Sequence, residues 1–317
     1  MKLFVRKIFL FVATILMLSA IADVLVSKGL KKSEKGHFYT LNHLMNDTLN
    51  NDVLIMGSSR ATCSYSPMII DSLLHVNSRN IAVSGQPFVI SNLRYTIYKR
   101  KNDNPKMILL NIDYSELQAP NNGYEREQYY PYIFDEEVKK ILKMNDFSWL
   151  EKYCPMYRYR GDSKLITLSL LEIFGLYHAS DDYCRGKGYV NNSNQIYNGE
   201  NLRNMLSKGK RLKYYPDEHE TDLFRQFCEE IIEDSIQLVF CYAPLYKVLY
   251  ENLDQDSIMQ IYNEMSEKYT IPLLDYTTDS MCSDTSFFKD SNHLNKKGSE
   301  LFTIKLCHDI DSLQLLN

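Results

Sequence analysis

Five short runs of apolar, β-prone residues do most to limit what this chain can fold into. They span residues 53–56 (VLIM), 80–84 (NIAVS), 107–114 (MILLNIDY), 236–243 (IQLVFCYA) and 271–276 (IPLLDY). Each run is almost continuously hydrophobic, which is typical of strands that are covered on both faces of a parallel sheet. The sequence therefore predicts about five buried parallel strands.

Helical patterns alternate with these runs. Residues 67–75 and 88–101 separate the first three runs, residues 219–234 and 250–268 precede the fourth and fifth, and residues 295–310 follow the last one. Alternating strands and helices are typical of a parallel sheet with right-handed crossovers and helices on both faces. We therefore expect a three-layer α/β/α domain.

A Tyr-rich interval from residue 118 to residue 218 interrupts this alternation. It is far too long for a plain connection between neighbouring elements. We interpret it as an insertion over one end of the sheet. Its tyrosines could form the core of a small subdomain with hydroxyls that reach water, which we favour for most of them, or a platform on which sugar rings stack.

The N-terminal segment is free of charge from Ile8 to Ala22 and, extended to Val26, reaches about the length that crosses a bilayer. Basic residues ahead of it predict that its start stays in the cytoplasm. We favour an uncleaved single-pass anchor in the cell membrane. The small-x-small pattern of Ala20-Ile21-Ala22 makes a cleaved secretion signal the alternative. In both cases we expect the rest of the chain on the extracytoplasmic (periplasmic) side.

The composition narrows the partners and cofactors. A net charge of -4 offers no basic field for a phosphate backbone, so we expect no nucleic-acid partner. The seven cysteines contain no CxxC pair, and their odd number excludes complete internal pairing. No spacing typical of zinc ligands is present. We therefore expect no disulfide framework, no metal and no cofactor. The expected parts are an anchor or signal (1–27), a polar stalk (28–50), the first half of the α/β domain (51–117), the insertion (118–218) and the second half (219–317).

Three polar corners lie where predicted strands end or a predicted helix begins. GSSR at 57–60 follows the first run, SGQ at 84–86 follows the second, and Asp290 and His293 precede the last helix. In open α/β sheets, ligands bind beyond the carboxyl ends of the strands. Each corner alone would suit an ordinary turn or helix cap. Together they supply the hydroxyl, imidazole and carboxylate of a serine triad, in which Asp290 would orient His293.

In this order the corners resemble the SGNH (GDSL-like) hydrolase superfamily, and more narrowly its membrane-anchored members in bacterial envelopes. The resemblance covers both halves of the α/β domain but not the insertion, and it implies a flavodoxin-like sheet. It maps Ser59 as the nucleophile, with Ser58 at the position of the family's aspartate. It maps Gly85 as an oxyanion-hole amide, and Asp290 and His293 as the closing Asp-x-x-His block.

The third block of that family, Gly-x-Asn-Asp, departs from the family pattern here. The corresponding stretch, LLNIDYSEL, places Asp113 where an asparagine donor is expected, with Asn111 two residues earlier on the same strand face. An ionised carboxylate cannot donate to an oxyanion. Either Asn111 supplies the donor, or the oxyanion hole uses only the amides of Ser59 and Gly85. We further predict that Arg60 pairs with Asp113 and neutralises it.

The resemblance implies an extracytoplasmic serine esterase that hydrolyses acyl esters, with acetyl esters favoured, of a cell-envelope glycan or lipid. Two alternatives stay open at this point. One is an O-acyltransferase that modifies a surface polysaccharide, for which an acyltransferase in the membrane could be the partner. The other is a catalytically inactive glycan-binding protein, which is favoured if Asp113 means that the oxyanion hole is broken.

Overall fold

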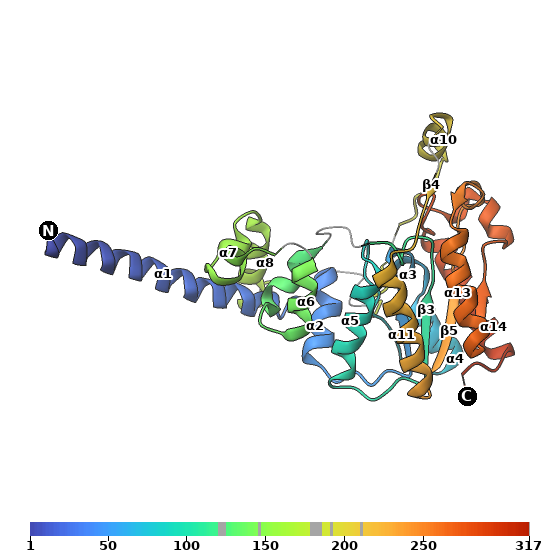
Figure 1. Cartoon of the computed structure of the whole chain (residues 1–317), viewed down its shortest axis with the longest axis horizontal. Helices are drawn as coiled ribbons and strands as arrows, with labels where there is room; N and C mark the ends of the chain where they lie inside the picture. Colours follow the sequence, from blue (N-terminus) through green and yellow to red (C-terminus); the bar gives the residue numbers. More distant parts are fainter. Residues whose placement is uncertain (120–124, 145–146, 178–185, 191–192, 210–211, 317) are drawn as a thin grey trace. The chain divides into compact units, whose positions relative to one another are not determined.

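The structure is a computed structural model that describes residues 1–119, 125–144, 147–177, 186–190, 193–209 and 212–316 (Figure 1). The chain divides into two compact units. Unit 1 comprises Met1–Asn42 and Glu125–Asp181, and unit 2 comprises His43–Tyr124 and Asp182–Asn317.

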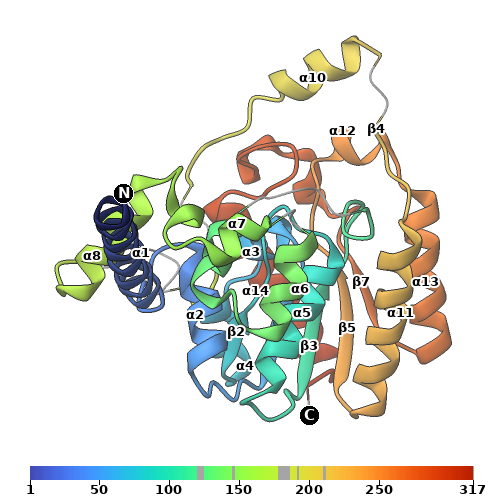
Figure 2. The same cartoon turned by 60° about the vertical axis from the view of Figure 1, so that its left-hand side comes forward.

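Unit 2 contains a five-stranded parallel sheet. Its strands are β1 (Val53–Met56), β2 (Ser78–Asn80), β3 (Met107–Asn111), β5 (Gln237–Tyr242) and β7 (Leu273–Asp275). Their order across the sheet is β2-β1-β3-β5-β7, and Figure 2 labels β2, β3, β5 and β7 of this sheet. This confirms the prediction of an α/β fold around a parallel sheet of five strands.

The second strand ends earlier than its apolar run. β2 ends at Asn80, yet the backbone continues alongside β1, because the amide of Ile81 donates to Ile55 (2.9 Å) and that of Val83 donates to Gly57 (3.0 Å). The apolar residues 81–84 therefore carry the chain to the same edge of the sheet at which β1 ends. This edge holds the first two polar corners.

Helices cover both faces of the sheet. On one face lie α5 (Phe88–Lys99), α11 (Glu218–Glu233) and α13 (Asp256–Tyr269); on the other lie α4 (Pro67–Leu74) and α14 (Lys296–Ser312) (Figure 1). Successive strand side chains point to opposite faces. Accordingly Phe240 contacts Phe224 of α11, whereas Cys241 belongs to the core that includes Phe302 of α14.

Shorter elements complete unit 2. The helix α3 (Ser59–Ser64) follows β1 directly, and β4 (Leu212–Lys213) pairs in parallel with β6 (Leu253–Asp254). The remaining elements are α10 (Glu200–Ser207), α12 (Lys247–Tyr250) and the 3-10 turns η3 (Ser280–Ser283) and η4 (Thr285–Phe287). The helix α2 (His37–Asn46) contains the boundary between the two units.

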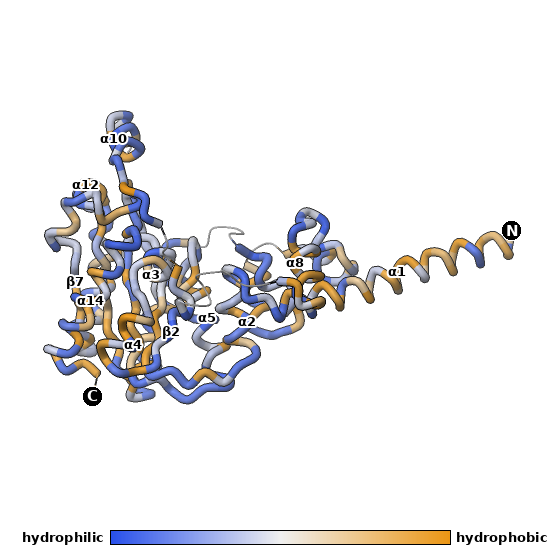
Figure 3. The backbone as a smooth tube through the Cα atoms, turned by 180° about the vertical axis from the view of Figure 1, so that it is seen from behind, coloured by the Kyte–Doolittle hydropathy of each residue, from blue (hydrophilic) through white to orange (hydrophobic). Residues whose placement is uncertain are grey.

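Unit 1 is built around the C-terminal part of the N-terminal helix α1 (Lys2–Leu30). This helix is long and apolar enough to cross a membrane or to be a signal sequence, and Figure 3 shows its hydrophobic character. It packs against α8 (Ser163–Ile173), and Asp23 forms an ion pair with Arg158 and accepts a hydrogen bond from the Met156 amide (2.8 Å). The other elements of the unit are η1 (Arg126–Tyr132), α6 (Glu136–Met144), α7 (Trp149–Tyr153) and η2 (Tyr157–Tyr159).

The segment predicted as a polar stalk, residues 28–50, is helical over the end of α1 and over α2. The predicted insertion is divided between the two units, because residues 125–181 belong to unit 1 and residues 182–218 to unit 2. Residues 120–124, 145–146, 178–185, 191–192 and 210–211 of that interval, including Cys184, lie outside the described residues. The six described cysteines are free thiols.

Candidate active site

The turn after β1 requires glycine at position 57. Gly57 has φ = 134°, a value that residues with side chains rarely adopt, and a Cβ there would lie 3.0 Å from Cβ and O of Asn111 on β3. The next residue, Ser58, caps α3 by accepting a hydrogen bond from the amide of Arg60 (3.3 Å). Ser59 is thereby the first residue of α3, at the carboxyl edge of the sheet.

The structure brings Ser59, His293 and Asp290 together. The Ser59 Oγ lies 2.8 Å from His293 Nε2, although the two residues are 234 positions apart in the sequence. His293 Nδ1 lies 2.9 Å from Oδ1 and 3.0 Å from Oδ2 of Asp290. This is the connectivity of a serine–histidine–aspartate triad, in which the carboxylate holds one ring nitrogen and the hydroxyl faces the other.

The loop that carries Asp290 and His293 is held at both ends. An isolated antiparallel bridge joins Phe288 to Leu294, and the amide of Lys289 donates to the carbonyl of His293 (3.0 Å). Asn295 then caps α14 by accepting from the Gly298 amide (2.9 Å). Within the loop, Asp290 Oδ1 accepts from the His293 amide (2.9 Å). The position of the imidazole is thus fixed by backbone contacts as well as by its ring.

The environment of Asp290 favours its charged form. Burial acts against the carboxylate, but the hydrogen bond and charge of His293, together with the amides of Asn292 and His293, outweigh it and lower the pKa of Asp290. A carboxylate that stays ionised can stabilise an imidazolium on its neighbour. This pair can therefore accept a proton from Ser59.

A small cavity opens beside Ser59. It has a volume of about 120 Å³ and is lined by Ser58, Ser59, Gly85, Gln86, Pro87, Ser115, Gln118 and Ala119. Gly85 has φ = 64°, in the left-handed region that favours glycine. Among the residues that the structure describes, no protein group accepts a hydrogen bond from the amide of Ser59 or of Gly85. Both predicted oxyanion donors therefore lie at one cavity with their N–H groups unused.

Asn111 does not lie at this cavity, so the expectation that it supplies the third oxyanion donor is not met. Its side chain is fully buried, and its Oδ1 accepts a hydrogen bond from the hydroxyl of Tyr65 (2.7 Å). The physical reason is that β3 ends at Asn111, which still points into the core that Tyr65 occupies.

Asp113 accepts hydrogen bonds from the turn that precedes Ser59 and from Ser115. Its Oδ2 accepts from Ser58 Oγ (2.6 Å), and its Oδ1 accepts from the amide (2.7 Å) and the hydroxyl (2.8 Å) of Ser115. The carboxylate is buried, so these three donors replace the water that it loses on folding. Asp113 thus links the residue before Ser59 to the chain that follows β3.

The predicted ion pair between Arg60 and Asp113 is not formed within the described part of the chain. The buried guanidinium of Arg60 instead donates to the carbonyl oxygens of Ala243 and Pro244 and lies 4.9 Å from the centre of the Tyr242 ring. Burial opposes the charge, but Tyr242 and Asp113 are close enough to raise the pKa of Arg60. Arg60 therefore fastens α3 to the segment after β5.

Beyond Ser58, Ser59 and Gly85, the cavity is lined by five residues that were not predicted from the sequence as site residues: Gln86, Pro87, Ser115, Gln118 and Ala119. All five lie in the segments that follow β2 and β3, and this position is the signal that could have identified them. Near the triad, Tyr114 donates a hydrogen bond to Asn292 Oδ1 (2.6 Å), which supports the loop between Asp290 and His293.

The described residues contain no group of three or more His, Cys, Asp or Glu side chains that could hold a metal ion. No family model matches the chain, and no curated protein sequence is significantly similar to it.

Proposed function

We propose that this protein is an extracytoplasmic, membrane-anchored serine esterase of the SGNH type. The observation that carries the proposal is the continuous chain of hydrogen bonds from Ser59 through His293 to Asp290 beside a cavity with two unused amides. A hydroxyl in contact with an imidazole that a carboxylate orients is the arrangement that activates a serine nucleophile.

The proposed reaction proceeds through an acyl-serine. His293 Nε2 takes the proton of Ser59, whose Oγ attacks the ester carbonyl, and the amides of Ser59 and Gly85 hold the oxyanion. His293 then gives its proton to the leaving alcohol as the ester bond breaks. In the second half, water attacks the acyl group, His293 takes its proton, and the proton returns to Ser59 as the acid leaves.

The size of the cavity favours a short acyl group. At about 120 Å³ it is well below the roughly 300–1,000 Å³ of pockets that enclose drug-sized ligands. An acetyl ester on a glycan or lipid of the envelope suits it better than a long fatty ester. Asn111 is not among the residues that line the cavity, so an oxyanion hole that uses only the amides of Ser59 and Gly85 should turn over more slowly than a complete one, by about the 10²–10³-fold that one such donor contributes.

A fluorophosphonate probe and p-nitrophenyl acetate test the proposal on the full-length protein in detergent. We expect the probe to label Ser59 and the acetate ester to be hydrolysed, and we expect both signals to disappear in Ser59→Ala. The matched control is Ser66→Ala, since Ser66 is a buried serine that is not among the cavity residues. A wild-type protein that takes up no probe would favour the glycan-binding alternative.

Oligosaccharide acceptors distinguish hydrolysis from transfer. If the acetyl group appears on an added oligosaccharide faster than in the water reaction, the protein is an O-acyltransferase that uses the same acyl-serine. If acceptors leave the release of acetate unchanged, the esterase assignment stands.

A further inference from the structure

The contacts that α1 makes with the rest of unit 1 lie toward its C-terminal end. The predicted span from Ile8 to Val26 amounts to about 28 Å of helix, which is close to the thickness of a bilayer core. The first residues of α1 that the protein buries are Val26, Gly29 and Leu30. Asp23, its first acidic residue, is paired with Arg158 of the same unit. The contacts of unit 1 with the helix therefore lie at the C-terminal end of this span and just beyond it.

Unit 1 also exposes apolar and aromatic side chains that a water-facing surface would not need. Trp149 and Phe174 are each 70% exposed, and the ring of Trp149 lies 5.6 Å from that of Tyr153. The other large exposed apolar residues of the unit outside α1 are Phe134, Leu150, Leu170 and Leu176. Tryptophan and tyrosine are enriched where a protein meets the headgroup region of a bilayer.

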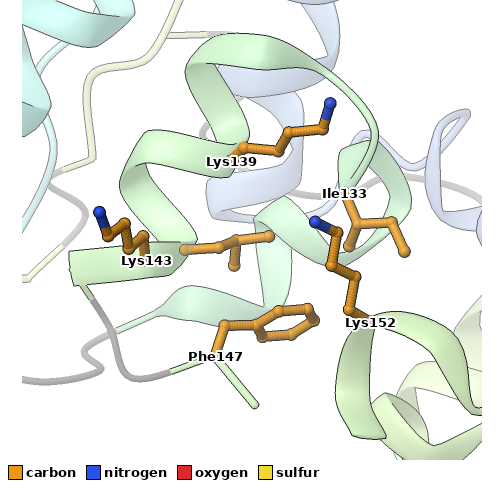
Figure 4. Close-up of a pocket in the computed structure, with 6 residues that line it drawn as sticks. Ile133, Lys139, Lys143, Phe147 and Lys152 are labelled. Atoms are coloured by element: carbon orange, nitrogen blue, oxygen red, sulfur yellow. The ribbon is translucent and has the colours of Figure 1, made fainter. Parts of the chain in front are cut away.

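A cavity of about 550 Å³ in this unit combines an apolar lining with three ammonium groups (Figure 4). The apolar part is formed by Ile133, Leu142 and Phe147, and the cations are Lys139, Lys143 and Lys152. Lys139 is bonded to Glu136 (2.6 Å). Among the described residues, Lys143 and Lys152 have no carboxylate within ion-pair distance, so they leave positive charge at the cavity. A site of this kind matches a ligand that is anionic at one end and apolar at the other.

We propose that this cavity binds the headgroup of an anionic phospholipid in the leaflet at the C-terminal end of α1. The ammonium groups of Lys143 and Lys152 contact the phosphate, while Ile133, Leu142 and Phe147 contact the start of the acyl chains. The apolar half of the lining, and the membrane-length helix α1 in the same unit, favour a lipid over free phosphate. The proposal is independent of the esterase chemistry, since every residue that carries it lies in unit 1.

The test uses the full chain in nanodiscs that contain phosphatidylcholine with a fraction of phosphatidylglycerol. Native mass spectrometry, after the protein is released from the nanodisc, measures how much of each lipid stays bound to it. We expect phosphatidylglycerol to be retained in preference to phosphatidylcholine. The double variant Lys143→Gln/Lys152→Gln should reduce this preference about 25-fold, since each lysine near an anionic lipid surface contributes roughly a factor of five. Lys140→Gln is the matched control, because Lys140 lies on the same helix but pairs with Glu137 and does not line the cavity.

Two further arms complete the test. Trp149 is the single tryptophan of the chain, so the fluorescence of the protein reports on this residue alone. Its emission should lie at shorter wavelength in nanodiscs than in the unfolded protein without detergent. Lipids brominated near the headgroup should quench it. Inorganic phosphate added before release should not displace the bound lipid. Equal retention of the two lipids, an unchanged preference in the double variant, or displacement by phosphate alone would each overturn the proposal.

Discussion

Replacing Gly57 with alanine should destabilise unit 2 by two separable effects. At φ = 134° a residue with a Cβ is strained, which costs about 1–3 kcal/mol. The new Cβ would also lie 3.0 Å from Asn111 and 3.1 Å from Cβ of Ala61, and overpacking of this kind costs about 1–3 kcal/mol. We therefore expect a loss of about 2–6 kcal/mol in the free energy of unfolding.

Gly209→Ala separates the strain from the clash. Gly209 also lies in unit 2 and has φ = 68°, but nothing lies within 4 Å of the Cβ that alanine would add. At Gly209 only the strain of the positive φ remains, and we expect Gly209→Ala to lose about 1–2 kcal/mol in the free energy of unfolding. If the two variants lose the same free energy within about 0.5 kcal/mol, the close approach of the Gly57 turn to β3 does not exist.

The assay should follow unit 2 and not the whole chain. Trp149 lies in unit 1, so its fluorescence reports on the wrong unit. Cys241 lies on β5 and is fully buried, so its alkylation in increasing urea, read by peptide mass spectrometry, reports the opening of the sheet. Fluorophosphonate labelling of Ser59 should fall about 100-fold in Gly57→Ala as well, since a displacement of about 1 Å in a reacting group has that effect.

Three other substitutions test the electrostatics of unit 2. Asp290→Asn should lower kcat for p-nitrophenyl acetate by about 10²–10³-fold, which is less than the roughly 10⁴-fold loss expected for a buried triad carboxylate. The reason is that the side chain of Asp290 is 48% exposed, so water can replace part of its effect. An unchanged kcat would remove Asp290 from the mechanism. Burial raises the pKa of Glu220 to about 7 in the folded protein. The folded state therefore holds this proton more tightly than the unfolded state does. Wild type should lose about 3 kcal/mol in the free energy of unfolding between pH 4 and pH 8, and Glu220→Gln should not. Cys241 alkylation at both pH values checks this, and the control Glu218→Gln, at an exposed position, should keep the pH dependence of wild type. Arg60→Ala should destabilise unit 2 by about 2–4 kcal/mol in the same assay, because the buried carbonyls of Ala243 and Pro244 lose a charged donor; wild-type stability would show that these contacts contribute nothing.

The strands β1, β3 and β5 could be predicted from the sequence because they are almost fully buried and so appear as continuous apolar runs. The strand β2 (Ser78–Asn80) is polar and overlaps its predicted run only at Asn80. The helices predicted at 219–234 and 295–310 correspond closely to α11 and α14, whose amphipathic patterns are regular. The helix predicted at 250–268 is shorter, since β6 occupies Leu253–Asp254 and α13 begins at Asp256. Pairing with β4 forms β6, and a partner distant in the sequence leaves no local pattern.

The sequence predicts those residues of the candidate site whose location follows from the order of the strands. Ser59 and Gly85 follow neighbouring strands, so the topology brings them to one edge. The roles of Asn111 and Arg60 depend on contacts that the sequence does not encode locally. The alternation of side chains was assumed to continue to Asp113, but β3 ends at Asn111 and Tyr65 holds that side chain in the core. For Arg60, a carboxylate was the obvious acceptor, whereas the fold offers two carbonyl oxygens from more than 180 residues away.

The separation of Ser59 from His293 has a consequence for the time at which the proposed triad can form. Ser59 is made early in synthesis, but the imidazole that contacts it belongs to the segment just before α14, which packs against α3 and α4. A nascent chain that has been synthesised only as far as β7 carries an ordinary serine with no imidazole beside it. Reactivity toward esters would therefore appear only when α14 has packed against the rest of unit 2. Chains that end before α14 would then be unreactive, and the fluorophosphonate probe would label only fully folded molecules.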